Sequence, residues 1–198
     1  MEVDSFEVPA PADLKRMIPF TDRATEGRVN AKGIPCLYLS TDRDTAMAEV
    51  RPWIGSYVSV GQFTIFRDLT VVDCSSDLAS SGLRFEGAEP EPGERERLVW
   101  GRINRAFSEP VTRSDDVADY APTQVLAEAF RVKGFDGIVY GSKVGVGKTV
   151  AIFDVAAADL INCHLYEVES INFKFSMAGN PYFIAKYYPD VVDPTDEG

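Results

Sequence analysis

The chain has 198 residues, and its 31 acidic against 20 basic residues give a formal net charge of −11. A single domain of this length buries roughly 70% of the surface of its unfolded chain, so it can hold a core without disulfides or metals. The acidic charge and the lack of a basic stripe disfavour nucleic-acid binding, and no apolar run approaches the roughly 18 residues that a membrane span needs.

By composition, the chain divides into an arm, a folded domain and a tail. Residues 1–20 are rich in proline and show little periodicity, which predicts an N-terminal arm lying over the domain. The folded domain is expected over residues 21–189, and the acidic residues 190–198 are expected to form a flexible tail. The acidic start lacks the basic and apolar stretches of a secretion signal, which favours a cytoplasmic protein.

The domain is expected to begin with a strand and a short helix. Residues 34–40 are β-prone, and residues 41–50 have a helical pattern. Thr41 and Asp44 resemble a capping box that opens this helix, and Pro52 limits it.

Two further strands and a polar excursion follow. Residues 57–66 and 69–73 alternate or group β-branched and aromatic side chains, with a short turn between them, so we expect them to pair as a hairpin. Residues 82–97 are mostly Glu, Pro, Gly and Arg, which predicts a mobile excursion.

The second half predicts two helices and three strands. Residues 98–107 and 122–133 are helical in pattern, and Gly134 is expected to end the second helix. The apolar stripe of that helix comprises Val125, Leu126, Ala129 and Phe130. The three strands are expected at residues 137–140, 149–154 and 160–175. The chain therefore belongs to the α+β class, a single domain with small mixed, mainly antiparallel sheets flanked by helices.

A glycine-rich segment at residues 142–149 reads Ser-Lys-Val-Gly-Val-Gly-Lys-Thr and ends like a phosphate-binding Walker loop. Ser142 stands where that motif needs its first glycine, and a strand follows Thr149 where the motif needs a helix N-terminus. We therefore expect a hairpin between two strands, which would still leave backbone amides and Lys148 near a ligand.

Cysteine and histidine usage argues against metal and hydrolase sites. Cys36, Cys74 and Cys163 are odd in number and widely spaced, so we expect buried free thiols and neither a disulfide framework nor a zinc site. His164 is the only histidine and lies in a half-buried strand pattern, without a glycine-flanked serine elbow elsewhere. A structural histidine is favoured over a Ser-His-Asp triad.

Three segments carry the most specific pattern. Residues 27–49 read Gly-Arg-Val-Asn, then a glycine, a Leu-Tyr strand and a helix with Thr-Ala and Glu. Residues 120–128 read Tyr-Ala-Pro-Thr-Gln-Val-Leu-Ala-Glu, and residues 134–142 read Gly-Phe-Asp-Gly-Ile-Val-Tyr-Gly-Ser. In this order and spacing, over about residues 27–154, the sequence resembles the RES-domain family, which is named for its arginine, glutamate and serine.

The resemblance implies a fold similar to ADP-ribosyltransferase toxins and a toxin of a toxin–antitoxin pair. It implies an enzyme that degrades NAD by phosphorolysis or hydrolysis, and an antitoxin that covers the active site. NAD is then a substrate, no other cofactor is expected, and inorganic phosphate is a candidate co-substrate. A homo-oligomer is left open.

The site residues follow from the matching positions. The resemblance implies four residues at the reacting centre: Arg28, Tyr38, Glu49 and Ser142. We expect further substrate contacts from Asn30, Lys32, Gln124, Tyr140 and Lys143, and no metal. Two positions depart from the family pattern, because Val29 replaces an aromatic residue and Lys143 replaces a small polar one.

The chemistry of NAD suits this residue set. Its leaving group is already a pyridinium, so nicotinamide departs without a general acid, unlike the leaving group of an ordinary glycoside. Glu49 can stabilise the positive charge that gathers on the ribose, and Arg28 offers a planar fork for phosphate oxygens. Tyr38 can pack against nicotinamide or ribose, and Ser142 can hydrogen-bond the carboxamide or a phosphate.

Taken singly, each residue has a plainer interpretation. Arg28 could form a surface ion pair, Tyr38 could belong to the core, Glu49 could face solvent, and Asn30 and Ser142 could cap turns. Two other functions also stay open. One is a protein mono-ADP-ribosyltransferase, and the other is a catalytically silent module that binds an anion or a partner.

Overall fold

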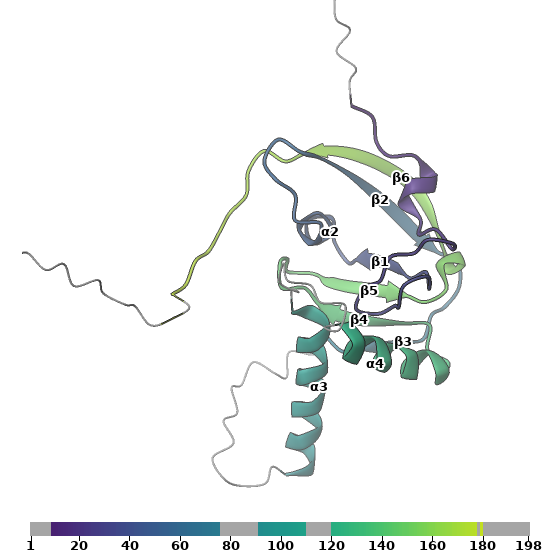
Figure 1. Ribbon diagram of the computed structural model, residues 1–198, viewed down its shortest axis with the longest axis vertical. Helices are drawn as coiled ribbons and strands as arrows, with labels where there is room; N and C mark the ends of the chain where they lie inside the picture. Colours follow the sequence, from purple (N-terminus) through teal and green to yellow (C-terminus); the bar gives the residue numbers. More distant parts are fainter. Residues whose placement is uncertain (1–8, 76–90, 110–119, 178, 180–198) are drawn as a thin grey trace, which may run out of the picture.

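Two β-sheets form the centre of the molecule. The computed structural model describes residues 9–75, 91–109, 120–177 and 179. A four-stranded sheet has the order β1-β5-β4-β3. Its strands are β1 (Leu37–Ser40), β3 (Val71–Asp73), β4 (Gly137–Gly141) and β5 (Lys148–Ile152). The second sheet is a two-stranded antiparallel ribbon of β2 (Tyr57–Ile65) and β6 (Ala158–Glu167), which arches over the first (Figure 1).

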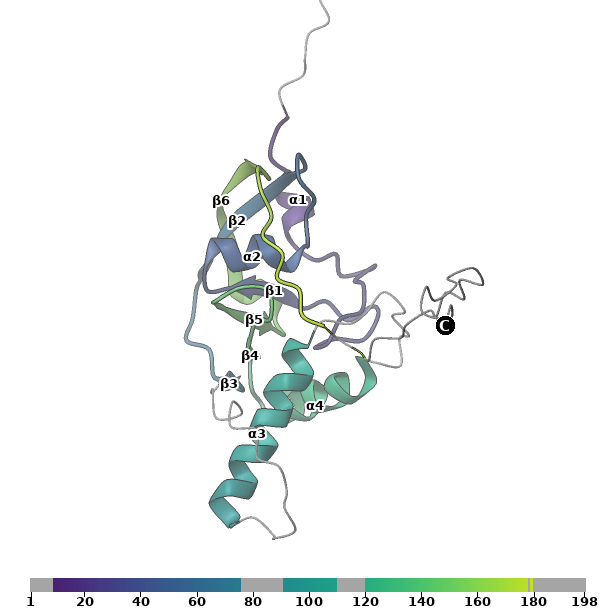
Figure 2. The same cartoon turned by 90° about the vertical axis from the view of Figure 1, so that its left-hand side faces the viewer.

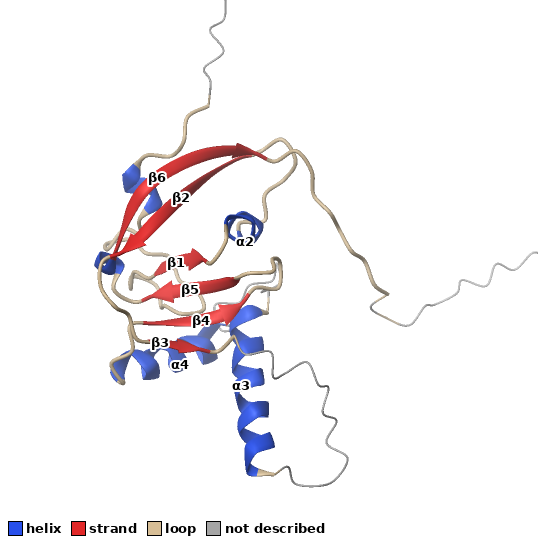
Figure 3. Cartoon of the chain, turned by 180° about the vertical axis from the view of Figure 1, so that it is seen from behind, coloured by secondary structure: helices blue, strands red, loops and turns tan. Residues whose placement is uncertain are grey.

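Helices lie on both sides of the four-stranded sheet. α3 (Pro92–Ser108) and α4 (Ala121–Val132) lie on the face away from the ribbon, and α2 (Arg43–Glu49) lies between the sheet and the ribbon (Figures 1 and 3). α1 (Leu14–Met17) lies beside the ribbon (Figure 2), where the amide of Ala12 donates to Ser59 Oγ at 2.9 Å. The short 3-10 helix η2 (Val155–Ala157) leads from β5 into β6.

The four-stranded sheet separates two apolar clusters. Ile138 and Ala151 are fully buried toward the helices, where Phe107 of α3 and Ala127 of α4 pack against them. Leu37 and Ile152 belong to a cluster on the other side with Phe63 of the ribbon. Because neighbouring positions of a strand point to opposite faces, the successive residues Ala151 and Ile152 serve the two clusters in turn.

The α+β prediction is confirmed, with mixed pairing as expected. β1 and β4 are antiparallel to β5, and β3 is parallel to β4. The glycine-rich segment after β4 is the predicted hairpin, because β4 and β5 pair from Gly137 opposite Ile152 to Gly141 opposite Lys148. The likeness to ADP-ribosyltransferase folds and the boundaries at residues 20 and 189 stay predictions, and the tail lies outside the described residues.

The predicted hairpin of residues 57–66 with 69–73 is wrong. β2 pairs with β6 and β3 pairs with β4, so the two segments belong to different sheets. The turn between them is held by distant partners: Arg67 lies 2.8 Å from Asp136, and the amide of Thr70 donates to the same carboxylate at 2.8 Å. These tertiary contacts outweigh the local preference for a tight turn.

The start of α3 and the end of β6 also differ from the predicted boundaries. α3 begins at Pro92, inside the expected excursion, because its charged residues are good helix formers even where no core covers them. The rest of that excursion, up to residue 90, lies outside the described residues. β6 ends at Glu167, well before the predicted residue 175.

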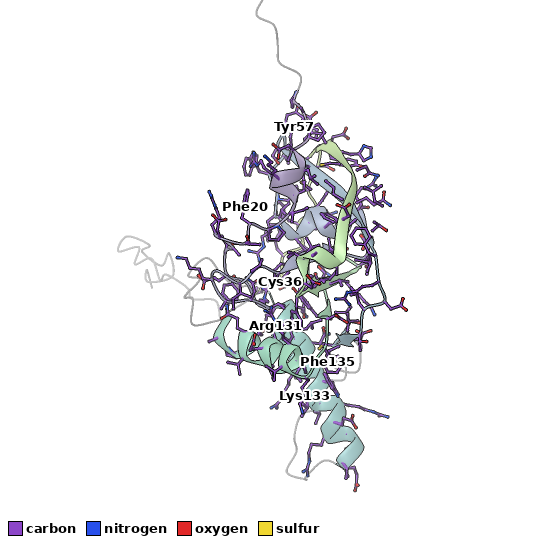
Figure 4. The ribbon with its side chains drawn as sticks, turned by 90° about the vertical axis from the view of Figure 1, so that its right-hand side faces the viewer. Phe20, Cys36, Tyr57, Arg131, Lys133 and Phe135 are labelled. Atoms are coloured by element: carbon purple, nitrogen blue, oxygen red, sulfur yellow. The ribbon has the colours of Figure 1, made fainter. Side chains whose placement is uncertain are left out.

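The predicted stripe of α4 is only partly buried. Val125 is 68% exposed, whereas Thr123 and Ala127 are buried against the sheet, since small side chains let the helix approach closely. Gly134 ends the helix as predicted, with φ at 87°. Figure 4 shows Arg131, Lys133 and Phe135 at this end of the helical layer, with Tyr57 at the opposite end of the molecule.

Candidate active site

A cleft of about 750 Å³ lies between the ribbon and the side of the four-stranded sheet that carries β1 and α2. Its volume lies within the range of small-molecule sites. Four predicted residues line it: Arg28, Tyr38, Glu49 and Tyr140. A smaller hollow, called the notch below, adjoins Arg28 and Glu49 and is also lined by Arg51, Ser108, Lys143 and Val144.

Glu49 is held by Ser142 at the edge of both cavities. The hydroxyl of Ser142 donates to Glu49 Oε1 at 2.7 Å and accepts from the amides of Val144 and Gly145 at 3.1 and 3.0 Å. Both hydrogen-bonding roles of the hydroxyl are therefore used, which fixes the direction of its proton toward the carboxylate. Glu49 is the last residue of α2, where the helix dipole disfavours an anion, so stability alone does not explain its position.

The β4–β5 hairpin is attached to α2 by backbone amides. Gly147 N donates to Thr45 Oγ1 at 3.0 Å, and Lys148 N donates to Thr41 Oγ1 at 2.9 Å. The N-cap of α2 is Asp42, one residue after the predicted Thr41, and its carboxylate accepts from Thr45 N at 2.8 Å. That amide holds the pKa of Asp42 below its ordinary value, because it stabilises the charged form.

The hairpin is rich in glycine because α2 lies so close to it. A Cβ at Gly147 would overlap the carboxylate of Asp42, and a Cβ at Gly145 would overlap Thr45. The glycines that resembled a Walker loop thus serve close packing. The seam they form with α2 brings Ser142 to Glu49.

Arg28 comes from the loop before β1 and faces the end of α3. Its Nη2 donates to the backbone carbonyl of Glu109, the C-cap residue of that helix. A cation at the C-terminal end of a helix is favoured by the helix dipole. Arg28 is half-buried, lines both the cleft and the notch, and therefore places positive charge beside Glu49.

Tyr38 and Asn30 fix the loop that carries Arg28. The hydroxyl of Tyr38 donates to Asn30 Oδ1 at 2.7 Å and accepts from Val29 N at 3.0 Å. Burial raises the pKa of Tyr38 well above its ordinary value, so the phenol stays neutral. The residue is still 40% exposed, and it lines the cleft.

Asn30 and Gln124 support this loop from behind. Asn30 is 3% exposed, and its amide donates to the carbonyls of Thr25 and Ile34, both at 2.8 Å. The amide of Gln124, on α4, donates to the carbonyls of Gly27 and Asn30 at 2.9 and 3.0 Å. Asn30 and Gln124 line neither the cleft nor the notch, and their amides hold backbone carbonyls of the loop that carries Arg28.

Tyr140 lies at the floor of the cleft. It is 4% exposed and stacks on Phe107 of α3, with 5.6 Å between the ring centroids. Burial raises its pKa well above the ordinary value, although the nearby Arg28 works against this. It therefore presents a neutral, rigid surface to the cleft.

The three lysines considered in the sequence differ in their position relative to the cleft and the notch. Lys32 is exposed and lines neither cavity, whereas Lys143 lines the notch. Lys148 lies 3.5 Å from Asp73 and lines neither cavity, and its place near a ligand stays a prediction.

Sequence reasoning missed the far wall of the cleft. Gln62 of β2 and Asn162 and His164 of β6 line it, and Arg43 of α2 stacks over Tyr166 of β6 with 5.2 Å to the ring centroid. The ribbon pairs residues about 100 positions apart, so no local pattern could indicate that these polar groups line the same cleft as Arg28 and Glu49.

The potential metal ligands and the cysteines were located in the described residues. Within them, no group of three His, Cys, Asp or Glu side chains is arranged to hold a metal ion. Cys36 and Cys74 are buried free thiols, as predicted, and burial raises the pKa of both to about 12, while Cys163 is half-buried. In the ranges that the structure covers, no helix is long and apolar enough to cross a bilayer.

Comparison with known proteins gives one family. A protein-family model described as the RES domain matches residues 6–176, a range that includes the cleft and the notch. The search of curated proteins gives no match.

Proposed function

This chain belongs to the RES domain family, and from that membership we propose that it degrades NAD by breaking the bond between nicotinamide and ribose. At a coarse level, the family supports a toxin–antitoxin-associated role related to NAD. The observation that carries the finer proposal is that Arg28 and Glu49 line the same cleft, with Ser142 orienting the carboxylate.

Glu49 stabilises the transition state. As the bond to the pyridinium stretches, its electron pair moves to the ring nitrogen and positive charge gathers on the ribose. A fixed carboxylate that accepts from a ribose hydroxyl binds this charge more strongly than it binds the ground state. Ser142 supports the step by holding Glu49 in one orientation, so little reorganisation is needed.

Arg28 and the two tyrosines hold the substrate. The Arg28 guanidinium suits the pyrophosphate or another phosphate, and it supplies local positive charge in a chain of net charge −11. Tyr38 and Tyr140 line the same cleft as neutral rings, which suit packing against nicotinamide or ribose. The polar ribbon wall is left for the adenosine half of NAD.

An antitoxin that covers this cleft is part of the proposal. The family supports such a partner at a coarse level, and a closed cleft is the direct way to silence an enzyme of this kind. Inhibition by the partner would then be competitive with NAD.

The test follows nicotinamide release from NAD by purified protein. Glu49→Gln removes the charge but keeps an oxygen that can accept from Ser142, and we expect it to abolish turnover while the fold is unchanged. Arg28→Ala should do the same. The matched control is Glu128→Gln, since Glu128 is exposed on α4 and lines neither cavity.

The product separates the alternatives. Free ADP-ribose or its phosphate supports NAD degradation, whereas an added ADP-ribosyl mass on a protein would make the chain a mono-ADP-ribosyltransferase. NAD binding in calorimetry without any turnover would make it a silent binding module. Full activity of Glu49→Gln would refute the mechanism.

A further inference from the structure

The chain leaves β6 as an extended segment, residues 169–177, which we call the arm and which runs away from the two sheets (Figures 1 and 3). Its root is fixed to the loop before β2. The amide of Gly55 donates to the carbonyl of Val168 at 2.8 Å, and the amide of Val168 donates to the carbonyl of Ser56 at 2.9 Å. Beyond this pair, no strand of the described residues pairs with the arm.

The arm has the sequence pattern of a half-buried strand. Apolar Ile171, Phe173, Phe175 and Met177 alternate with polar residues, a period that places them on one face of an extended chain. The rings of Phe173 and Phe175 do lie together, stacked with 6.1 Å between their centroids. Yet Phe173 is 68% exposed, and Phe175 and Met177 are each 86% exposed. The apolar face of the arm is therefore uncovered in the described structure.

A second exposed apolar surface, called the rim, lies at the end of α2 and on the β4–β5 hairpin. It consists of Val50, Trp53, Ile54, Val144 and Val146. Val50 follows Glu49 at the end of α2, and Val144 lines the notch together with Glu49, so the two parts of the rim adjoin. Trp53 is 74% exposed and the side chain of Val146 is fully exposed. Contiguous apolar surface of this kind marks a site of protein association.

The arm is built to reach another molecule rather than to fold back. Residues 169–177 contain neither glycine nor proline, so nothing in the arm favours the sharp turn that would lay it on the rim of its own chain. Its alternating aromatic residues favour straight, extended backbone instead. In the structure, the arm accordingly points away from the body that carries the rim (Figure 1).

From these observations we infer that two copies of this chain form a dimer by exchanging arms, each arm lying on the rim of the other copy. Arm and rim belong to the same chain, so one two-fold axis provides for both contacts at once. The rim adjoins the notch, and the exchanged arm therefore lies beside the candidate active site.

The charges allow two acidic chains to meet at this place. A net charge of −11 repels a second copy over most of the surface. The arm, however, carries one acid and one base, Glu169 and Lys174, and is neutral. The two segments that form the rim add the bases Arg51 and Lys143. The contact thus pairs a neutral arm with a basic rim.

The exposed apolar area is sufficient for a stable dimer. With large side chains of about 150–250 Å², the exposed fractions of arm and rim give on the order of 1,000 Å² for one contact. Reciprocal exchange makes two such contacts, or about 2,000 Å² at most, whereas a typical stable interface buries about 1,600 Å² in total. A single arm on a single rim would fall short of that size.

The experiment measures the mass of the full chain by analytical ultracentrifugation over a wide range of protein concentrations. We expect a monomer–dimer equilibrium for the wild type. The arm variant, Phe173→Ser with Phe175→Ser, and the rim variant, Trp53→Ser with Ile54→Ser, should each raise the dissociation constant of the dimer at least tenfold. All four side chains are exposed, so urea unfolding of a dilute, monomeric sample should be unchanged.

The matched control removes exposed apolar side chains from other surfaces. Phe66, after the far end of β2, is 63% exposed, and Val125 of α4 is 68% exposed. The double variant Phe66→Ser with Val125→Ser should dimerise as the wild type does.

A mixture of the arm variant and the rim variant identifies exchange between copies. In their heterodimer one of the two contacts joins an intact arm to an intact rim, whereas every contact within either pure variant is damaged. We therefore expect dimers in the mixture at concentrations at which each variant alone is monomeric.

Three results would overturn the inference. One is a wild type that stays monomeric at every concentration, whether its arm then covers its own rim or awaits a different protein. The others are a dimer that survives both variants, and a mixture that dimerises no better than its components. The measurement needs no NAD, so none of these results bears on the proposed function.

Discussion

Replacing Ser142 by alanine tests whether the orientation of Glu49 matters for catalysis. The substitution removes the hydrogen bond of 2.7 Å from the hydroxyl to the carboxylate and leaves the charge in place. A hydrogen bond to a charged group contributes about 1.5–3 kcal/mol. If that energy serves the transition state, kcat/KM falls by about 10- to 150-fold.

The same change has a smaller effect on stability. The hydroxyl also accepts from the amides of Val144 and Gly145, which lie at the surface of the hairpin where water can replace it. We therefore expect the free energy of unfolding to fall by only about 1 kcal/mol. The control is Ser56→Ala, which removes an exposed hydroxyl bond of 2.7 Å to the carbonyl of Trp53, away from both cavities.

The assay is nicotinamide release under saturating and limiting NAD, with urea unfolding of each variant in parallel. A positioning role predicts a lower kcat with KM for NAD within twofold, and Ser142→Thr, which keeps the hydroxyl, should recover most of the activity. If Ser142→Ala keeps more than half of the wild-type kcat/KM while folded, the reasoning about Glu49 fails.

Three further predictions concern the structure around the site. Gly147→Ala should push the β4–β5 hairpin away from α2, and we expect the kcat of NAD cleavage to fall at least tenfold. Wild-type activity would show that the close packing of the hairpin on α2 does not position the site. Tyr38→Phe leaves the backbone amide of Val29 and the side-chain oxygen of Asn30 without their partner, and it should lower the free energy of unfolding in urea by about 1–3 kcal/mol. The control Tyr57→Phe, at an exposed tyrosine, should change this free energy little. The Thr70 amide and Arg67 hold the pKa of Asp136 below 3.8, so its contribution to stability is present above that pH and is lost as pH falls through the folded pKa. Asp136→Asn should therefore flatten the loss of stability below about pH 4, and an unchanged slope would contradict this.

Local patterns predicted the elements whose causes are local. The turn between β4 and β5 follows from glycines between two β-prone runs, and Gly134 ends α4 because only a residue that tolerates positive φ fits there. The pairing of β2 could not be predicted in the same way. Alternation along Tyr57–Ile65 indicates a strand, but its partner β6 begins almost 100 residues later, and nothing in the alternation names that partner.

The candidate site was likewise predictable from the sequence only in part. The order and spacing of the motif indicated Arg28, Tyr38 and Glu49 by position, and the structure brings them to one cleft. Their supporting roles needed coordinates, because Asn30 looks like a substrate ligand in the sequence and is buried in backbone hydrogen bonds. The sequence did not indicate Arg51 as a lining residue of the notch, because a left-handed backbone before proline runs against the local conformational preference.

The hydrogen bond between Glu49 and Ser142 joins residues that are 93 positions apart in the chain. At ordinary rates of translation, about 5–20 residues per second, roughly 5 to 20 s separate the synthesis of the carboxylate from that of the hydroxyl. A growing polypeptide therefore cannot orient its glutamate until the hairpin has left the ribosome. For the proposed NAD cleavage, this interval precedes the appearance of the first active molecule.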